Sequence, residues 1–492
     1  MTARNFTPLG GLRNVSDFKA QLRKLNCALP CDDELLTGSN SPLGGSIDLG
    51  EKSIGNRFAI HPMEGWDGTP SGRPSALTLR RWSNFGTSGA KLIWGGEAVA
   101  VLAEGRANPN QLCIGDTSHA DLAALRETLI AAHRAATGDA NDLLIGLQLT
   151  HSGRFSRPHE KQKPEPRILY RHPILDPRLH IDSDDATLTD DEIKKIIEAF
   201  HRAAKVAHDV GFDFVDIKHC HGYLGHEFLS AHTRPGIYGG SFENRTRFLR
   251  EVTEGVRAAA AGLEIGVRLS AFDTIPYRAD PATSRPHQMG IGVPEPYEHL
   301  LPYVWGFAID SEHPEQYDLA ETLRFLALLR GLGIRLINIS AGSPYTNPHI
   351  QRPALYPPSD GYQPPEDPLI GVGRQLEVAR LIKRAFPEMI VVGTGFTYLQ
   401  QFLPFVAQGA LRENWFDAVG LGRMVLSYPQ LPLDVLRDGA LTHSKLICRT
   451  FSDCTTAPRN NLPSGCYPLD DFYKSSEMAG SLKQIKRRAR AE

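Results

Sequence analysis

Side chains that donate and accept protons gather in one short segment of this 492-residue chain. The apolar run from Phe212 to Ile217 is followed directly by Lys218, His219 and His221, and Tyr223 comes two residues later. Such a run is typical of a buried parallel strand, and α/β enzymes carry their chemistry where these strands end. The segment therefore predicts a catalytic site, although a chain with 18 histidines also brings some together by chance.

Short apolar segments recur along the chain and alternate with segments of helical period. The expected strands are residues 57–60, 91–94, 143–149, 212–217, 265–269, 335–339, 389–392 and 416–419. This alternation predicts βα units, and eight strands of this kind predict an α/β fold, the closed (β/α)8 TIM barrel. An open doubly wound sheet is the alternative, but no GxGxxG motif opens a helix after the first strand, as a dinucleotide-binding domain requires.

The helix with the clearest signals spans residues 189–210. Thr189 and Glu192 form a capping box, apolar residues then recur on one face, and Gly211 ends the helix. The helix leads directly into the strand that begins at Phe212. Further helices are expected at residues 120–136, 243–260, 318–329 and 375–386.

The composition is that of a soluble enzyme. Hydrophobic residues make up 41% of the chain, charged residues 22%, and the formal net charge is -2, so nothing indicates nucleic acid or an anionic membrane as a partner. No run of some 18 apolar residues and no signal-peptide core is present, and 7 cysteines are too few for a disulfide scaffold. A cytoplasmic location is therefore expected.

We expect three parts: an N-terminal extension (residues 1–42), the barrel (43–440), and a C-terminal extension (441–492) with a cysteine cluster and a basic tail. Residues 39–50 are predicted to form a loop or short hairpin that closes the barrel floor. The basic tail, residues 481–492, is expected to be frayed and solvated rather than a binding site.

Two long segments follow predicted strands. Residues 273–316 are rich in Pro and Gly and are interpreted as a lid over the site or as an elaborated surface loop. Residues 345–368 contain Tyr and Arg side chains that are candidates for substrate contacts.

Motifs at or near the strand ends point to a family. In chain order they are NRFAIHPM (56–63), EAVAVLAEGR (97–106), QLTHSGR (148–154), HGYLGHEFLS with YGGSFENRTRF, VRLS (267–270) and GLGR (420–423). Together, over roughly residues 43–433, they resemble the Old Yellow Enzyme family of FMN-dependent NADH:flavin oxidoreductases, especially its larger branch with the 2,4-dienoyl-CoA reductases and trimethylamine dehydrogenase. The resemblance implies the (β/α)8 barrel and bound FMN.

The resemblance also implies flavin contacts. Reduced flavin carries negative charge near N1 and the C2 carbonyl, which a cation and amide donors stabilise. Arg268 and Gln148 match the family's residues at that position. Pro62, Met63 and Ala98 correspond to residues that lie along the isoalloxazine ring.

For the FMN phosphate, the resemblance implies backbone amides and a guanidinium after the last two strands. Gly393 and Gly395 in VVGTGF, and Gly422 and Arg423 in GLGR, occupy these positions.

For the substrate, the family holds the carbonyl of an α,β-unsaturated compound with two side chains spaced i and i+3. His221 matches the second of these, and Tyr223 matches the proton donor to the α carbon. The first position, usually histidine, is Lys218, whose point charge favours an anionic or strongly polarised oxygen. By strand alternation His219 points away from Lys218 and has a structural role.

Glu64 is a second departure, since relatives carry a small polar residue after the matching Pro and Met near the flavin C4 carbonyl. One hypothesis is that Glu64 forms an ion pair with Lys218. Another is that Glu64 accepts the proton of flavin N5. The alternative to both is a side chain turned away from the ring.

Larger relatives carry an iron-sulfur cluster on four closely spaced cysteines just after the barrel. Cys448, Cys454 and Cys466 fall near three of these positions, but Phe451 or a neighbour takes the remaining one. Four thiolates are the usual complement, so inert structural cysteines are favoured over an iron-sulfur cluster or zinc.

The favoured function is reduction of an activated C=C bond, with hydride from flavin N5 and a proton from Tyr223. The chain ends without the nucleotide-binding domains of the larger relatives, so electrons are expected directly from NAD(P)H or from an electron-transfer protein. A flavin-dependent amine or alcohol dehydrogenase, or a demethylase, is the alternative, and a non-catalytic barrel that binds a ligand is least favoured. The partner is a small-molecule substrate of unknown identity, and the oligomeric state stays open.

Overall fold

The protein forms an α/β barrel, seen in a computed structural model that describes residues 6–286 and 288–491. The barrel strands are β3 (Phe58–Ile60), β4 (Leu92–Ile93), β6 (Leu144–Thr150), β7 (Phe214–Ile217), β8 (Glu264–Ser270), β11 (Leu336–Ser340), β12 (Ile390–Gly393) and β13 (Ala418–Leu421). They pair in parallel, in the order β4-β3-β13-β12-β11-β8-β7-β6, and pairing of β6 with β4 closes the circle. The predicted TIM barrel is confirmed, because each expected strand is present within a few residues of its predicted bounds.

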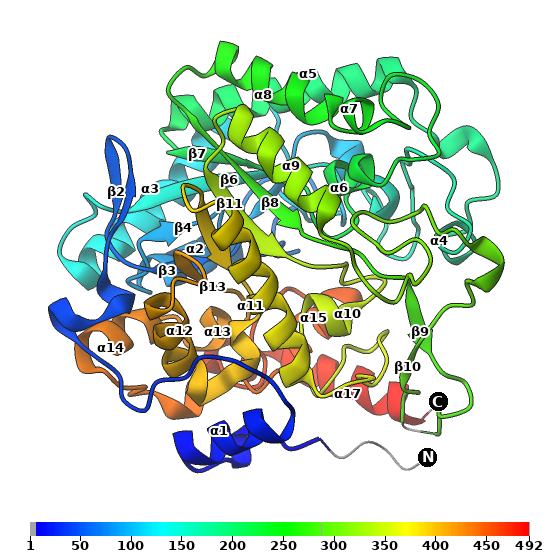
Figure 1. The fold of residues 1–492 in the computed structure, drawn as a ribbon. Helices are drawn as coiled ribbons and strands as arrows, with labels where there is room; N and C mark the ends of the chain where they lie inside the picture. The colour runs from blue at the N-terminus through cyan, green and yellow to red at the C-terminus, as the bar shows by residue number, and fades with distance from the viewer. Residues whose placement is uncertain (1–5, 287, 492) are drawn as a thin grey trace.

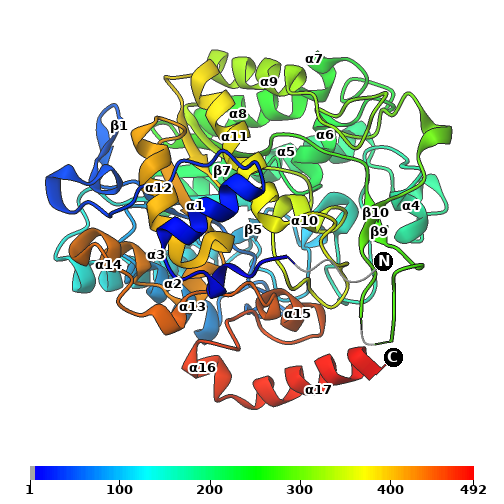
Figure 2. The same ribbon diagram turned by 60° about the horizontal axis from the view of Figure 1, so that its bottom comes forward.

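Helices surround the barrel (Figures 1 and 2). The larger ones are α2 (Ala76–Gly86), α3 (Ser118–Thr137), α5 (Asp190–Val210), α8 (Arg247–Ala259), α9 (Ala320–Gly331), α11 (Pro368–Ala385), α12 (Leu403–Arg412) and α14 (Leu431–Asp438). The helix expected at residues 243–260 is two helices, α7 (Phe242–Arg245) and α8, since the chain bends at Thr246. The shorter elements are β5 (Ala98–Ala100), α4 (Leu175–Arg178), α6 (Leu224–Leu229), α10 (Pro348–Gln351) and α13 (Met424–Ser427).

Helix α5 shows how the sequence delivers the strand that carries the proposed chemistry. The Thr189 hydroxyl accepts from the Glu192 amide, and the Glu192 carboxylate accepts from the Thr189 amide at 2.8 Å, as the capping box predicts. Gly211 then ends the helix in the left-handed conformation, with φ of 90°. The chain turns back and enters β7, whose four residues are all buried.

The barrel floor is filled by a hairpin, as predicted. Strands β1 (Ile47–Leu49) and β2 (Lys52–Ile54) pair in antiparallel fashion. Their buried side chains join one apolar cluster with residues near the starts of the barrel strands, among them Ala59, Leu92 and Leu144. The opposite end, where the strands finish, is the end at which TIM barrels carry their sites.

The segment of residues 273–316 forms an arm beside the barrel rather than a cover over its mouth. It contains the antiparallel pair β9 (Tyr277–Ala279) and β10 (Gly292–Pro294), and the Gly292 amide donates to the Gln363 carbonyl at 2.9 Å. None of its described residues lines the cavity at the mouth, so the lid interpretation is not supported and the surface-arm interpretation fits.

The two chain extensions pack on the barrel. At the N-terminal end, α1 (Val15–Lys24) places Phe18 in a stack on Phe402, with ring centres 4.4 Å apart. At the other end, α15 (Asp453–Arg459) and α16 (Asp471–Lys474) precede α17 (Glu477–Ala491).

The prediction of a frayed basic tail is wrong over the described part of the chain. Helix α17 buries Leu482 against Tyr467 and Tyr473, and Lys486 forms an ion pair of 2.5 Å with Asp453 of α15. The high charge of this segment favoured the prediction that it is solvated. Its few apolar residues at helical spacing are nevertheless enough to pack the helix against the rest of the C-terminal extension.

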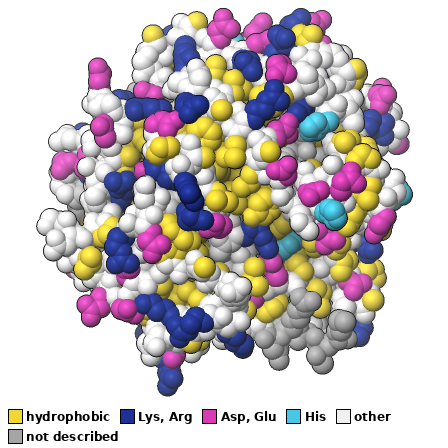
Figure 3. All heavy atoms as spheres, viewed as in Figure 1, with side chains coloured by type: hydrophobic (Ala, Val, Ile, Leu, Met, Phe, Trp, Pro, Cys, Tyr) yellow, Lys and Arg dark blue, Asp and Glu magenta, His cyan; other side chains and the backbone are white. Residues whose placement is uncertain are grey.

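Acidic and basic side chains are interspersed on the face of the molecule seen in Figure 3. This distribution agrees with the near-zero net charge of -2. Among residues 6–286 and 288–491, no helix combines the length and apolarity that a membrane span requires.

Candidate functional site

A cavity of about 270 Å³ opens at the carboxyl end of the barrel strands. The predicted site residues that line it are Pro62, Met63, Glu64, Ala98, Gln148, Lys218, His221, Tyr223, Arg268, Gly395, Gly422 and Arg423. Gly393 is the exception, because it is buried as the last residue of β12, and Thr394 and Gly395 face the cavity in its place. Residues from strands far apart in the sequence therefore meet in one site.

Asp216 of β7 aligns the polar residues at one end of the cavity. Its carboxylate accepts from the Gln148 side-chain amide at 2.6 Å and from the Arg268 backbone amide at 2.7 Å. The Arg268 guanidinium donates to the Pro62 carbonyl at 3.3 Å, and its buried Nε has no hydrogen-bond partner among the described residues. Burial lowers the pKa of Arg268, although nearby Cys220 and Asp216 oppose the shift. At this end of the cavity, the Arg268 guanidinium is buried and its Nε–H is available to donate to a ligand.

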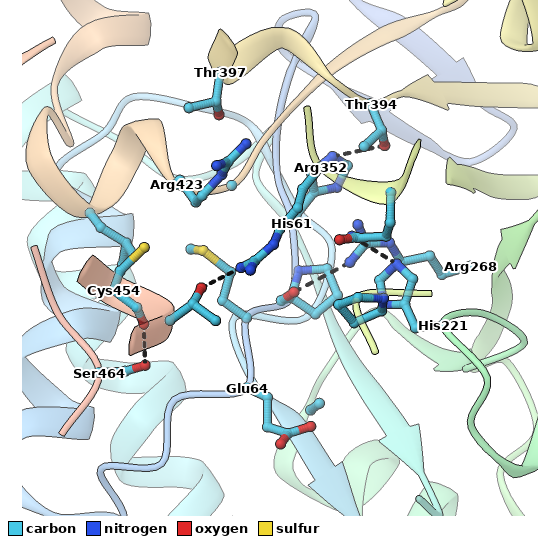
Figure 4. A pocket seen from close by; sticks show the side chains of 18 of the residues that line it. His61, Glu64, His221, Arg268, Arg352, Thr394, Thr397, Arg423, Cys454 and Ser464 are labelled. Atoms are coloured by element: carbon cyan, nitrogen blue, oxygen red, sulfur yellow. Dashed lines mark hydrogen bonds between the residues drawn. The ribbon is translucent and has the colours of Figure 1, made fainter. Parts of the chain in front are cut away.

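Two further arginines line the cavity away from Arg268 (Figure 4). Arg423 Nη2 donates to the Pro353 carbonyl at 3.1 Å, and Arg352 donates to the Thr455 hydroxyl. In the described part of the chain, Arg423 Nη1 and Arg352 Nη2 are buried without partners. Figure 4 shows Arg423 and Thr397 on one side of the cavity, Arg268 and His221 on the opposite side, and Arg352 between them.

The guanidinium N–H groups of Arg268, Arg352 and Arg423 that lack partners show whether the site fits FMN. A buried guanidinium N–H left without an acceptor costs about 1–3 kcal/mol, so three of them around one cavity indicate an anionic ligand. FMN carries a phosphate at one end and, when reduced, negative charge on the ring at the other. The separation of Arg423 from Arg268 matches that distribution, and the residues present fit the group.

His221 is neutral in this site. Its Nε2 lies 3.0 Å from the Ser340 hydroxyl and 3.2 Å from the Gln351 side-chain nitrogen, so Nε2 accepts and Nδ1 carries the proton. Burial, together with the cations Arg268 and Lys218, holds the pKa of His221 well below its ordinary value. The residue has φ of 67°, a strained conformation that its backbone hydrogen bond to the Ser270 hydroxyl helps to hold.

The Lys218 ammonium lies 3.6 Å from the centre of the Tyr223 ring. Burial lowers the pKa of Lys218, and nearby Cys220 and Glu64 counter part of that shift. The hypothesis of an ion pair between Lys218 and Glu64 is wrong: both residues are described, and no such pair joins them. Lys218 contacts the aromatic face instead, an arrangement that suits a desolvated ammonium.

Glu64 is bound into a network around Tyr223. Its carboxylate accepts from the Tyr223 hydroxyl at 2.8 Å, from the Trp66 indole at 2.7 Å and from the Asn108 amide at 3.3 Å. The Tyr223 hydroxyl also lies 2.9 Å from the Tyr345 hydroxyl. Burial, and then the Glu64 charge, raise the pKa of Tyr223 well above its ordinary value. Tyr223 therefore keeps its proton until a reaction removes it.

The loop that carries Glu64 is fixed by a buried ion cluster. Arg81 donates to Asp67 at 2.7 Å and also pairs with Glu97, which in turn accepts from the Gly65 amide at 2.8 Å. A Cβ at Gly65 would lie 1.7 Å from the Arg81 guanidinium, so any other residue would have to displace Arg81 from its ion pairs with Asp67 and Glu97. Because breaking a buried charge cluster costs about 3–5 kcal/mol, the loop is held firmly.

Other residues of the same motifs lie outside the cavity. His219 Nδ1 donates to the Ile217 carbonyl at 2.9 Å, and its ring packs between Phe248 and Phe325, so its predicted structural role is confirmed. Arg154 is buried and pairs with Asp176 and Glu227.

The sequence interpretation missed several residues that line the cavity: His61, Trp66, Gln351, Arg352, Thr394, Thr397, Cys454 and Arg459. His61 lies within NRFAIHPM and was passed over between better-known neighbours. Gln351 and Arg352 belong to the segment of residues 345–368, where Tyr and Arg contacts were anticipated without a residue being chosen. Cys454 and Arg459 come from the C-terminal extension, where the sequence marked Cys454 only as a candidate metal or cluster ligand and gave no signal for Arg459.

The three C-terminal cysteines do not form a recognisable metal centre. Burial raises the pKa of Cys448 to about 11 and also raises the pKa of Cys466. In the part of the chain that the structure describes, no three His, Cys, Asp or Glu side chains are grouped to hold a metal ion. The iron-sulfur or zinc alternative thus gains no support, whereas Cys454 contributes to the cavity wall.

Comparisons with known proteins agree with the fold and the site. The chain is 36% identical over 184 residues to an NADPH dehydrogenase of Geobacillus sp. (strain WCH70), a match covering 37% of this chain and 48% of that protein. The chain thus spans about half the length of this curated relative. Morphinone reductase has the same fold, with a TM-score of 0.53 at 22% identity over 82% of this chain and 91% of that one. A 2-naphthoyl-CoA reductase complex gives a TM-score of 0.64 at 17% identity over 88% and 57%.

A family model describing the NADH:flavin oxidoreductase / NADH oxidase family matches residues 43–318, more than half of the chain. The match includes the strands that carry Gln148, Lys218 and Arg268, and its start coincides with the expected start of the barrel. The resemblance first seen in short motifs thus extends over a continuous stretch, and the chain belongs to the NADH:flavin oxidoreductase / NADH oxidase family.

Proposed function

We propose that the protein is an FMN-dependent NAD(P)H oxidoreductase that reduces the activated C=C bond of an α,β-unsaturated carbonyl compound. The observation that carries the proposal is the convergence of Arg268 and Gln148 with His221 and Tyr223 on one cavity. Family membership supports the flavin, and the NADPH dehydrogenase relatives support NAD(P)H as the reductant.

FMN, when bound, supplies the hydride that the substrate's β carbon receives. Arg268 and the Gln148 amide would hold the pyrimidine end of its ring, with Pro62, Met63 and Ala98 along the ring. Arg423, with the backbone of Gly395 and Gly422, would hold the phosphate. In this arrangement the protein contributes binding, orientation and fixed positive charge.

His221 and Lys218 would bind the carbonyl oxygen of the substrate. The neutral imidazole donates through Nδ1, while the ammonium is a second, charged donor. Both groups are shielded from water, so they stabilise the negative charge that grows on the oxygen more strongly than exposed groups would. Because Lys218 replaces the usual histidine, the site should prefer strongly polarised carbonyl groups.

Tyr223 would deliver the proton to the α carbon. Its hydroxyl donates to Glu64 in the resting site and must turn toward the substrate to react. Glu64 is only partly buried, so it connects the buried phenol to solvent and can return a proton to Tyr223 after transfer. This assignment uses Glu64 as a relay and as a positioning group for the hydroxyl.

We also propose that the three expected parts of the chain hold, with the barrel at residues 43–440 between two extensions. The first and last barrel strands, β3 and β13, pair with each other, and α14 ends at Asp438. The C-terminal extension belongs to the site, since Cys454 and Arg459 line the cavity.

Amine oxidation is the second candidate, and Glu64 is the observation that favours it. The carboxylate lines the cavity without an ion-pair partner among the described residues and would attract an ammonium group. Against it stand Lys218, Arg268, Arg352 and Arg423, which make the same cavity strongly cationic.

Anaerobic mixing of the purified yellow protein with NADPH tests the proposal. We expect bleaching of the flavin absorbance, followed by rapid reoxidation when a cyclic enone is added. Bleaching by amines but not by NADPH or NADH would replace the ene-reductase assignment with the dehydrogenase one. A colourless protein that does not bind added FMN would contradict both.

A further inference from the structure

A second group of cations, Lys161, Arg157 and Arg459, lies beside the cavity, and Arg459 lines both the cavity and a neighbouring hollow. Lys161 places its ammonium 4.1 Å from the centre of the Trp66 ring. Arg157 and Arg459 line a neighbouring hollow of about 360 Å³. That hollow shares Pro344, Tyr345 and Arg459 with the flavin cavity, so the two spaces adjoin.

Lys161 is in an unusual position for an ammonium group. Its Nζ is shielded from solvent and has no hydrogen-bond partner among residues 6–286 and 288–491. Burial, then Arg459 and Arg157, lower the pKa of Lys161 to about 7. Among the described residues, the contact that favours its charge is the Trp66 face, which offsets part of the desolvation cost.

The two arginines leave this positive charge largely uncompensated. Arg459 pairs with Asp360, whose side chain is 56% exposed, and donates to the Pro344 carbonyl at 3.4 Å. Within the described chain, the Arg157 guanidinium has neither an ion pair nor a hydrogen bond. With Lys161 protonated, the three cations and one carboxylate would carry a net charge of two, and the repulsion between these like charges is part of what lowers the pKa of Lys161.

Two other arginines of the same hollow behave differently. Arg178 and Arg278 both pair with Glu295, the latter at 2.9 Å. The carboxylate that Arg178 and Arg278 share is largely buried, whereas the Asp360 partner of Arg459 is 56% exposed and Arg157 has no carboxylate partner among the described residues. The weakly compensated charge of the hollow therefore lies at Arg157 and Arg459.

We propose that Lys161, Arg157 and Arg459 form an anion-binding subsite for a phosphate or carboxylate group on a molecule whose reacting end reaches Tyr223. The subsite rests on the proposed function for the identity of that molecule. Arg157 and Arg459 line the hollow, and Lys161 lies close enough for their charges to lower its pKa. Guanidinium donors with an ammonium nearby suit an oxyanion with several acceptor oxygens. The anion comes either from the nucleotide phosphates of NADPH or from an acidic group on the unsaturated substrate.

Tyr345 lines the hollow of the subsite and contacts Tyr223, the proposed proton donor. Tyr345 stacks on Phe155, with ring centres 4.1 Å apart, and its hydroxyl lies 2.9 Å from that of Tyr223. Arg157 and Arg459 both act on the Tyr345 phenol electrostatically. An anion bound beside Tyr345 would therefore hold the rest of its molecule against the mouth of the cavity.

Calorimetric titration of the FMN-loaded full chain tests the subsite without turnover. The probes are adenosine 2′,5′-bisphosphate, a benzalacetone with a para-carboxylate, and plain benzalacetone as the neutral match. We expect the K161M/R157M double variant to lose about tenfold or more in affinity for one anionic probe, since each tenfold step corresponds to about 1.4 kcal/mol. R278M, whose parent side chain is already paired with Glu295, serves as the matched control and should bind both anions as the wild type does.

The outcome separates the two sources and separates the subsite from the proposed function. Loss confined to the bisphosphate assigns the subsite to the nucleotide, and loss confined to the carboxylate assigns it to the substrate. Unchanged binding of both anions, with the variant folded and yellow, overturns the subsite even if enones are reduced. A tenfold loss in a protein that reduces no enone leaves the subsite in place and contradicts the proposed function alone.

Discussion

The two walls of the flavin cavity are built in different ways. On the barrel wall, Arg268 and Gln148 are aligned by the carboxylate of Asp216, which sits on a hydrogen-bonded strand. On the opposite wall, Arg352 and Arg423 are held by a hydroxyl and a carbonyl, without a carboxylate partner among the described residues. The barrel wall is set before any ligand arrives, whereas the opposite wall depends on an anion to neutralise it.

The largest effect is expected at Arg268. Replacing it by methionine removes the guanidinium at the Asp216 end and should lower kcat/KM for an enone by about 100- to 1000-fold, the usual cost of losing a charge-stabilising donor. The measurement is stopped-flow reduction together with the flavin midpoint potential, which should fall. R268K, which keeps the charge, should recover part of the potential, and an unchanged potential in R268M would contradict the assignment.

Tyr223→Phe should slow the reoxidation of the flavin by an enone but not the reduction of the flavin by NADPH. Reoxidation by an enone is expected to slow by about 100-fold, because the proton donor is lost. Flavin reduction by NADPH should stay close to the wild-type rate. Tyr238→Phe is the control, since that buried phenol bonds Glu251 at 2.7 Å and lies outside the cavity. Equal slowing of both halves would point to a structural defect instead.

Glu64→Gln tests whether Glu64 returns a proton to Tyr223 or takes no part in the reaction. We expect reoxidation by an enone to slow by about tenfold, because Tyr223 loses its route for regaining a proton. The slowing should grow as pH rises and protons in solution become scarce. A variant in which neither the flavin potential nor turnover changes would remove Glu64 from the mechanism.

Arg352→Met tests the opposite wall. FMN is expected to dissociate about five- to tenfold more readily, because one charge-assisted contact is lost, while turnover at saturating FMN changes little. Fluorescence of released FMN measures the change. Arg374→Met provides the control, since Arg374 already pairs with Glu366 at 2.6 Å. A fall in turnover as large as that of R268M would mean that the two walls do not differ as described.

The smallest effect concerns pH. The pKa of His221 lies well below its ordinary value, so the ring stays neutral as pH falls from 8 to 6. The kcat/KM for an enone should therefore show no step due to His221 in that range. A step near pH 6.5 that disappears in His221→Asn would show that the imidazole is more exposed to water than its contacts indicate.

The sequence was most informative about regular strands and helices, in which the backbone conformation is the same from residue to residue. Strand alternation placed His219 outward and Lys218 inward, and the capping box placed the start of α5 at the right residue. The same regularity brought the predicted residues at the strand ends together. These elements are local, so a short stretch of sequence contains their physical cause.

Residues on the opposite wall could not be placed in that way. Arg352 and Arg459 reach the cavity through irregular segments whose course depends on contacts between distant parts of the chain. The ion pair expected between Glu64 and Lys218 failed for a similar reason: opposite charges were in range, but a phenol hydroxyl and an aromatic face offered each a better partner. Charge alone does not choose among several neighbours.

The floor hairpin of β1 and β2 has a consequence for the order of events. Because apolar side chains fill the bottom of the barrel, molecules can approach the reacting groups from the strand-end side, where NAD(P)H and the substrate would need the same space. Reductant and oxidant should then exclude each other, so excess of either is expected to inhibit the other competitively, and product must leave before the next partner enters. The β1–β2 hairpin at one end of the barrel is therefore expected to make NAD(P)H and the substrate bind in turn at the other end.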